Sequence, residues 1–151
     1  GGIAALAGGK KERLERIVRE ARQQSGSPID TKIFEPVTLE QAIDLWNKIK
    51  EESGDDACAG FVLSERNVDE ESPFDPFDPF DPFDKLRDRN ECTQKAVCIV
   101  CGNEGGISPV ELEQITKKAL LYPVHFSVNI LRCETAALYG IAAVQTAISG
   151  F

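Results

Sequence analysis

A proline-rich repeat near the middle of the chain limits the fold more than any other feature of the sequence. The stretch Ser72–Asp84 reads SPFDPFDPFDPFD, and Pro-Phe-Asp repeats without interruption from Pro73 to Asp84. A proline at every third position removes backbone donors and excludes both a helix interior and a central strand. The sequence therefore predicts an extended low-complexity insert loop over residues 67–82, with packed elements before and after it.

The repeat also offers candidates for docking a partner protein. It holds four of the eight phenylalanines, and each Asp-Pro-Phe unit places an aromatic anchor beside a fixed proline and a carboxylate. The units resemble the Asp-Pro-Phe peptides that bind clathrin-adaptor appendage domains, and tandem copies strengthen weak contacts. The alternative is an insertion that a surface loop tolerates. The predicted docking residues are Asp75, Phe77, Asp78, Phe80, Asp81 and Phe83.

The composition fits one domain over residues 1–151, because 42% of the residues are hydrophobic. A net charge of -8 argues against a general nucleic-acid binder, since phosphate binding needs a basic surface, and no sequence-specific nucleic-acid partner is predicted, although the basic end could contact a membrane or RNA. The charge is uneven: Lys10–Arg22 holds six basic residues, whereas Glu51–Glu91 holds fourteen acidic ones. The absence of a signal peptide or a membrane-spanning apolar run, together with five cysteines, indicates an intracellular protein.

Apolar spacing and capping residues predict several helices. An apolar stripe predicts a helix over residues 10–26, and Thr38 with Gln41 forms a capping box for a helix over residues 39–53. Ser108, Pro109 and Glu111 mark the clearest helix start in the chain.

The remaining apolar segments are also interpreted mainly as helices. DACAGFVLSER favours a helix, and a long helix is predicted from Asp81 to Gly102. VHFSVNIL has the composition of a strand, and the unassigned segment 123–151 ends in a helix that is buried or lies in an oligomer interface. The predicted fold class is mostly α, a compact bundle of five to six helices with an extended Pro/Phe/Asp-rich loop.

The cysteines are predicted to be core residues, with a metal site as the alternative. Cys98 and Cys101 have the spacing of half a zinc ribbon, but the sequence holds no second pair. A small zinc-binding domain is therefore a second alternative function. His125 is the only histidine, and no phosphate loop or nucleophile elbow is present. The sequence accordingly predicts no catalytic residue, no cofactor and no enzyme.

Several segments, taken in order, resemble the matrix domain of a lentiviral Gag polyprotein. GGIAALAGGKKERLERI is similar to that family's start, LEQAIDLWNKIKEESG to its tryptophan-bearing second helix, and SPVELEQITKKALL to its fifth helix. The resemblance covers residues 1–122. It departs from the family at Ala5, where the myristoylation signal has Ser or Thr, and in its acidic overall charge.

The resemblance implies a viral structural module that targets membranes and assembles without enzymatic activity. It implies self-association and a peripheral location on anionic membrane lipid, with an acyl chain and a basic helix acting together. The alternative is an interaction protein that docks its partner through the Phe-rich loop. The implied lipid-binding residues are Gly1, Lys10, Lys11, Arg13, Arg16 and Arg19.

Overall fold

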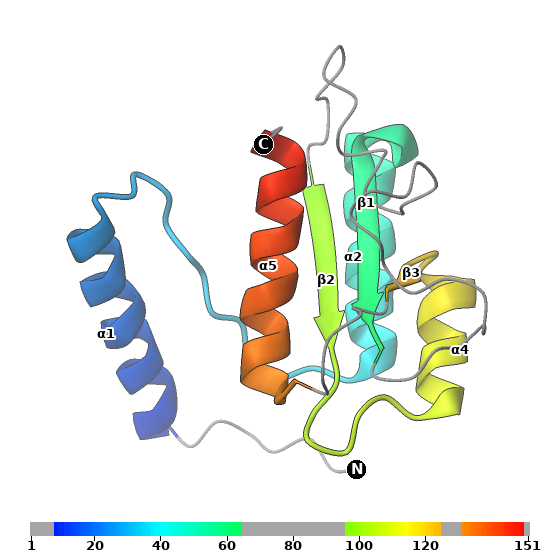
Figure 1. The fold of residues 1–151 in the computed structure, drawn as a ribbon, viewed down its shortest axis with the longest axis horizontal. Coiled ribbons are helices and arrows are strands. Elements are labelled where there is room, and N and C mark those ends of the chain that lie inside the picture. The colour runs from blue at the N-terminus through cyan, green and yellow to red at the C-terminus, as the bar shows by residue number, and fades with distance from the viewer. Residues whose placement is uncertain (1–7, 65–95, 125–130, 150–151) are drawn as a thin grey trace. The chain divides into compact units, whose positions relative to one another are not determined.

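The computed structural model describes residues 8–64, 96–124 and 131–149, and it divides the chain into two compact units. The N-terminal unit is Gly1–Ala42 and the sheet unit is Ile43–Phe151. In chain order the elements are α1 (Gly8–Ser25), α2 (Leu39–Ser53), the 3-10 helix η1 (Asp55–Ala57), β1 (Cys58–Leu63), β2 (Ala96–Cys101), α4 (Pro109–Lys118), β3 (Tyr122–Val124) and α5 (Cys133–Ser149) (Figure 1).

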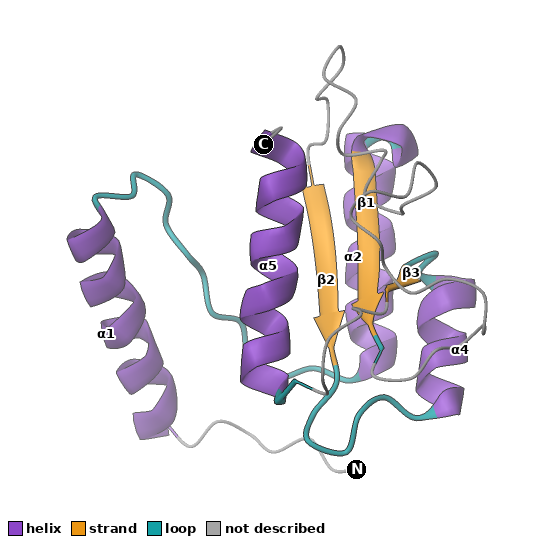
Figure 2. Cartoon of the chain, viewed as in Figure 1, coloured by secondary structure: helices purple, strands orange, loops and turns teal. Residues whose placement is uncertain are grey.

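The fold is α/β, so the prediction of a bundle of five to six helices is wrong. The sheet unit contains both helices and strands (Figure 2), and two apolar segments predicted to be helical are strands instead. These are CAGFVL, which forms β1, and AVCIVC, which forms β2. The rest of the predicted helix 81–102 and the predicted insert 67–82 lie outside the described residues.

The three strands form a parallel sheet in the order β2-β1-β3. Cys58 pairs with Ala96 at the start of β1, and Leu63 pairs with Cys101 at its end. On the other side of β1, Leu63 also pairs with Val124 of β3. All three strands therefore end at the same edge of the sheet, which we call the carboxyl edge.

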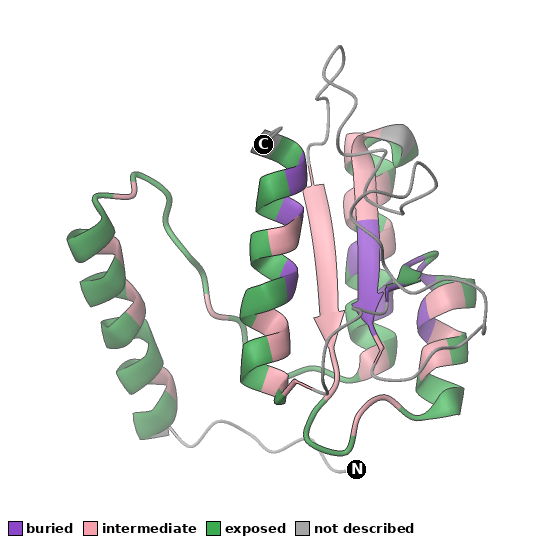
Figure 3. Cartoon of the chain, in the orientation of Figure 1, coloured by how far each residue is buried: buried purple, intermediate pink, exposed green. Residues whose placement is uncertain are grey.

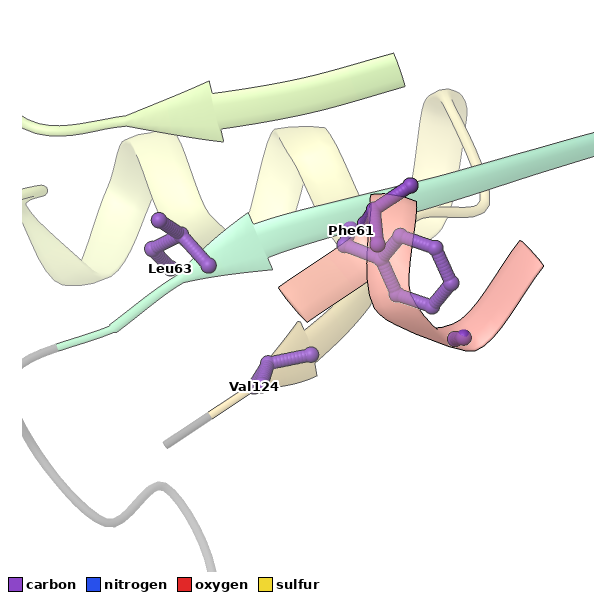
Figure 4. Close-up of a cluster of buried hydrophobic side chains, with 5 residues drawn as sticks. Phe61, Leu63 and Val124 are labelled. Atoms are coloured by element: carbon purple, nitrogen blue, oxygen red, sulfur yellow. The ribbon is translucent and has the colours of Figure 1, made fainter. Parts of the chain in front are cut away.

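Helix α5 covers one face of the sheet. Phe61 and Leu63 of β1 and Val124 of β3 point toward this helix and form a buried cluster with Val144 and Ala147 (Figure 4). Successive strand residues point to opposite faces, so the alternate residues of β2 share this face. They are Val97, Ile99 and Cys101, which pack against the same cluster.

Helix α2 covers the opposite face. Gly60 lies so close to Leu121 and Trp46 that an added Cβ would be 2.7 Å from Leu121 Cγ and 3.5 Å from Trp46 Cζ2. Because layers cover both faces, β1 is the most buried strand, and Val62 is 0% exposed (Figure 3). A strand buried on both faces has no polar alternation in its sequence.

The predicted helix starts are confirmed. Thr38 and Gln41 exchange two side chain to backbone hydrogen bonds of 3.0 and 3.2 Å at the start of α2. Ser108 and Glu111 do the same before α4, with Pro109 as its first residue. These capping boxes satisfy backbone donors that a helix N-terminus leaves unpaired.

The C-terminal end of α4 is held by α2 within the sheet unit. Asn47 Nδ2 donates to the carbonyl of Lys118 at 3.1 Å, and Lys50 Nζ donates to the carbonyl of Ala119 at 3.3 Å. These donors satisfy carbonyls that the helix itself cannot pair. Across the described ranges, no helix has both the length and the apolar character needed to cross a membrane.

Candidate ligand site at the carboxyl edge

A glycine-rich turn follows β2 at the carboxyl edge. Its sequence is Gly102-Asn103-Glu104-Gly105-Gly106. The side-chain oxygen of Asn103 accepts from the Gly105 amide at 2.8 Å, and the Asn103 carbonyl accepts from the Gly106 amide at 2.9 Å. Gly106 has φ 74, a left-handed conformation that glycine adopts without strain. We call residues 102–106 the glycine turn.

The glycine turn is closed so tightly that its first position has no room for a side chain. A Cβ on Gly102 would lie 2.8 Å from the carbonyl carbon of Gly106 and 3.0 Å from Ile107 Cγ1. The nearest of these atoms belongs to the backbone, which does not move aside as a flexible side chain does. The turn therefore presents bare backbone at the end of β2.

The first residues of α5 meet the end of β2 and the glycine turn. A hydrogen bond of 3.1 Å from Cys133 Sγ to Glu134 Oε2 raises the pKa of Cys133, and the charge of Glu104 raises it further. Burial raises the pKa of Cys101, with a contribution from Cys133. The same hydrogen bond lowers the pKa of Glu134. Two carboxylates, from the turn and from α5, thus lie beside the carboxyl edge.

This edge is where open parallel α/β sheets bind ligands. Ligands of this fold class lie outside the carboxyl ends of the strands, against glycine-rich turns that let the backbone approach them closely. The sheet unit has such a turn after β2, and Ser64 follows β1 at the same edge, where its amide donates to the carbonyl of Val124 at 3.0 Å. These features make the carboxyl edge the candidate ligand site of the sheet unit, with acidic residues beside it.

The comparisons with known proteins identify the family. The profile of a family described as an RNA methyltransferase domain matches residues 5–145. The chain therefore belongs to this family. No match to a curated protein is found. One solved structure, described only as a hypothetical protein, has a TM-score of 0.66 and 23% identity. It shares the fold over 92% of this chain, which spans 65% of that protein.

Membership of this family overturns several expectations from the sequence. The resemblance to a Gag matrix domain is wrong, and so are the viral assembly function, the anionic lipid partner and the exclusion of nucleic acid, because the match covers nearly the whole chain. The expectation that the chain is not an enzyme is also wrong, since the family is one of methyltransferases. The alternatives of a loop-docking protein and a zinc-binding domain have no support in the match.

The sequence-predicted site residues are not gathered at the carboxyl edge. Lys10, Lys11, Arg13, Arg16 and Arg19 all lie on α1 in the N-terminal unit. Gly1 and the six docking residues of the repeat lie outside the described residues. Cys98 and Cys101 are three positions apart on β2, so they point to opposite faces and cannot hold one metal ion together.

The residues that do form the edge were missed for an identifiable reason. In the sequence, Gly102 has the pattern of a helix end, and neither Glu104 nor Glu134 belongs to a recognisable motif. The available signal was the order of elements: an apolar β-branched run, then a glycine-rich turn, then a helix with a strong N-cap. That order is typical of a strand, a ligand-binding turn and a crossover helix.

Proposed function

We propose that the chain is the donor-binding and catalytic part of an RNA methyltransferase that uses S-adenosylmethionine. The observation that carries this proposal is the closed glycine turn beside two carboxylates at the carboxyl edge of a parallel sheet. The family match supplies the reaction class and the substrate class.

The residues at the edge fit this donor chemically. S-adenosylmethionine supplies an electrophilic methyl group on a positively charged sulfonium, next to an ammonium group. Glu104 and Glu134 place negative charge where a cation would be attracted. The bare backbone of the glycine turn allows a nucleoside to approach closely, as in other parallel sheets.

The protein's own contribution is then mainly to position the two substrates. The glycine turn and the strand ends orient the donor, and the carboxylates attract its positively charged groups. Holding the methyl group in line with a nucleophile on RNA removes most of the entropic cost of a two-substrate reaction.

Donor binding by the purified chain tests the proposal. Isothermal titration calorimetry with S-adenosylmethionine should show one site, and Gly102→Ala should weaken it at least about tenfold, since a loss of one or two kcal/mol in fit is a factor of that order. A tritiated methyl group should pass to RNA only with the wild-type turn. Absence of donor binding to a folded wild-type chain would contradict the proposal.

Two glycine variants serve as matched controls. Gly9→Ala adds a methyl group where no atom lies within 4 Å and should change neither folding nor binding. Gly60→Ala overpacks the core against Leu121, away from the glycine turn, and should lower stability by about 1–3 kcal/mol without weakening donor binding in the fraction that is folded. The pair separates a damaged site from a damaged fold.

A further inference from the structure

Helix α1 is the one described helix with a concentrated positive charge. It holds six of the chain's 17 basic residues but only three of its 25 acidic ones. The rest of the chain is therefore strongly acidic and repels a polyanion. An RNA substrate that meets this chain needs a basic surface, because phosphate contacts supply most of the non-specific affinity.

One face of α1 is covered by the connector that follows it. Lys11 forms an ion pair with Glu35, and Arg22 pairs with Asp30 at 2.9 Å. Arg22 also donates to the carbonyls of Ser27 and Pro28 at 3.2 and 3.4 Å. Lys11 and Arg22 lie on the same side of the helix, eleven residues or three turns apart. The connector therefore neutralises two cations and occupies that side.

The remaining cations lie outside the side of α1 that the connector covers. Lys10, Arg13, Arg16 and Arg19 follow one another at intervals of three, so neighbouring Cβ atoms are about 5–6 Å apart and the row winds around about half of the helix. All four are exposed. Arg16 has a weak, exposed pair with Glu20 at 4.0 Å, and within the described residues the other three show no ion pair. We call these four residues the basic ladder.

We propose that the basic ladder of α1 binds the phosphate backbone of the RNA substrate. The inference rests on the proposed function, because it takes RNA as the substrate. Arginine and lysine side chains at regular spacing on a helix contact phosphates without reading sequence. Their exposed side chains are free to reach phosphates along a nucleic-acid backbone.

A three-residue neutralisation tests the ladder. Fluorescence anisotropy with a labelled single-stranded RNA should be measured across a series of salt concentrations for Lys10→Gln, Arg13→Gln and Arg19→Gln combined. Loss of three phosphate contacts should reduce the slope of log K against log salt by about 2, at roughly 0.7 per contact on single strands. The matched control replaces Lys48, Lys117 and Lys118 by Gln, the same charge change on α2 and α4, and should leave the slope unchanged.

An opposite substitution makes the test independent of folding. Glu20→Gln removes the acid beside Arg16 and should tighten RNA binding and steepen the salt slope. An unchanged slope in the triple variant, with donor binding intact, would overturn the ladder and leave the proposed function standing. Preference for anionic phosphatidylserine vesicles over RNA at equal phosphate would also overturn it. Failure of donor binding in the wild-type chain would instead count against the proposed function.

Discussion

At the scale of single residues, the reactivity of the thiols depends on the residues that surround them at the carboxyl edge. Cys133 donates a hydrogen bond to Glu134, and this contact holds the pKa of the thiol above its ordinary value of 9.0. Thiolate is the form that reacts with alkylating agents. Cys133 should therefore be alkylated slowly at neutral pH although it is partly exposed.

Removal of the carboxylate should reverse this protection. In Glu134→Gln the pKa of Cys133 falls, and its alkylation by iodoacetamide at pH 8 should become faster, as measured by mass spectrometry of the Cys133 peptide. Glu113→Gln is the control, because that carboxylate pairs with Lys117 on α4. An equal rate at Cys133 in all three proteins would show that Glu134 does not influence the thiol.

The pKa of Cys98 is shifted by burial alone, without a hydrogen-bond partner or a nearby charge as a cause. Burial alone raises the pKa of this thiol on the middle strand positions of β2. The folded chain holds the proton more tightly than the unfolded chain, so the contribution to stability is complete below pH 9.0 and is lost as pH rises above it. Alkylation of Cys98 should become fast only when urea unfolds the chain; fast alkylation under native conditions would contradict its burial.

At the scale of the secondary structure elements, the N-cap of α4 joins the glycine turn to a helix. The Ser108 side chain accepts from the Glu111 amide at 3.3 Å, and the Glu111 carboxylate accepts from the Ser108 amide at 3.0 Å. Ser108→Ala should lower the free energy of unfolding by about 1 kcal/mol. Urea titration followed by the fluorescence of Trp46, the chain's only tryptophan and a buried one, measures this change.

The capping box also predicts a pH dependence. Its hydrogen bonds to Ser108 lower the pKa of Glu111, so the stabilisation is present above the unfolded-state value of 4.5 and is lost as pH falls through the lower folded-state value. The difference between wild type and Ser108→Ala should therefore shrink in acid. Val110→Ala, at a side chain 64% exposed, should show neither effect. A constant difference down to pH 3 would contradict the role of Glu111.

The same elements show what could be predicted from the sequence. Helix starts were found because a capping box is local: Thr38 and Gln41, or Ser108 and Glu111, are three residues apart. The strands were missed because CAGFVL and AVCIVC are short apolar runs, which periodicity cannot distinguish from buried helix. Their state depends on pairing Cys58 with Ala96 across the insert, which is a property of tertiary structure.

The candidate site was hidden for the same reason. Glu104 and Cys133 are far apart in the sequence, and the charge of Glu104 acts on the Cys133 thiol only because β2 and α5 pack together. The basic residues of α1 were correctly predicted to lie on one helix, but the ligand predicted for them, anionic membrane lipid, was wrong. Charge alone does not distinguish an anionic lipid from a nucleic acid.

At the scale of the whole molecule, the two units should respond to different ligands. The sheet unit contains the proposed donor site and the buried core, whereas α1 has Leu14 and Ile17 of its apolar stripe 40% and 47% exposed. A helix with few buried contacts opens locally at low free energy. Amides of α1 should therefore exchange hydrogen much faster than those of β1 in the free chain.

Hydrogen exchange with each ligand then tests the assignment of both sites. S-adenosylmethionine at about 100 times its dissociation constant should add about 2.7 kcal/mol to the stability of the unit that binds it. Exchange should slow in β1, β2 and α5 while α1 is unaffected, and RNA should slow exchange in α1 instead. Gly102→Ala should abolish the first effect alone, and neutralising Lys10, Arg13 and Arg19 the second alone. If either ligand slowed exchange equally in both units, the assignment of the two ligands to different units would be contradicted, because the chain would then respond as one cooperative unit.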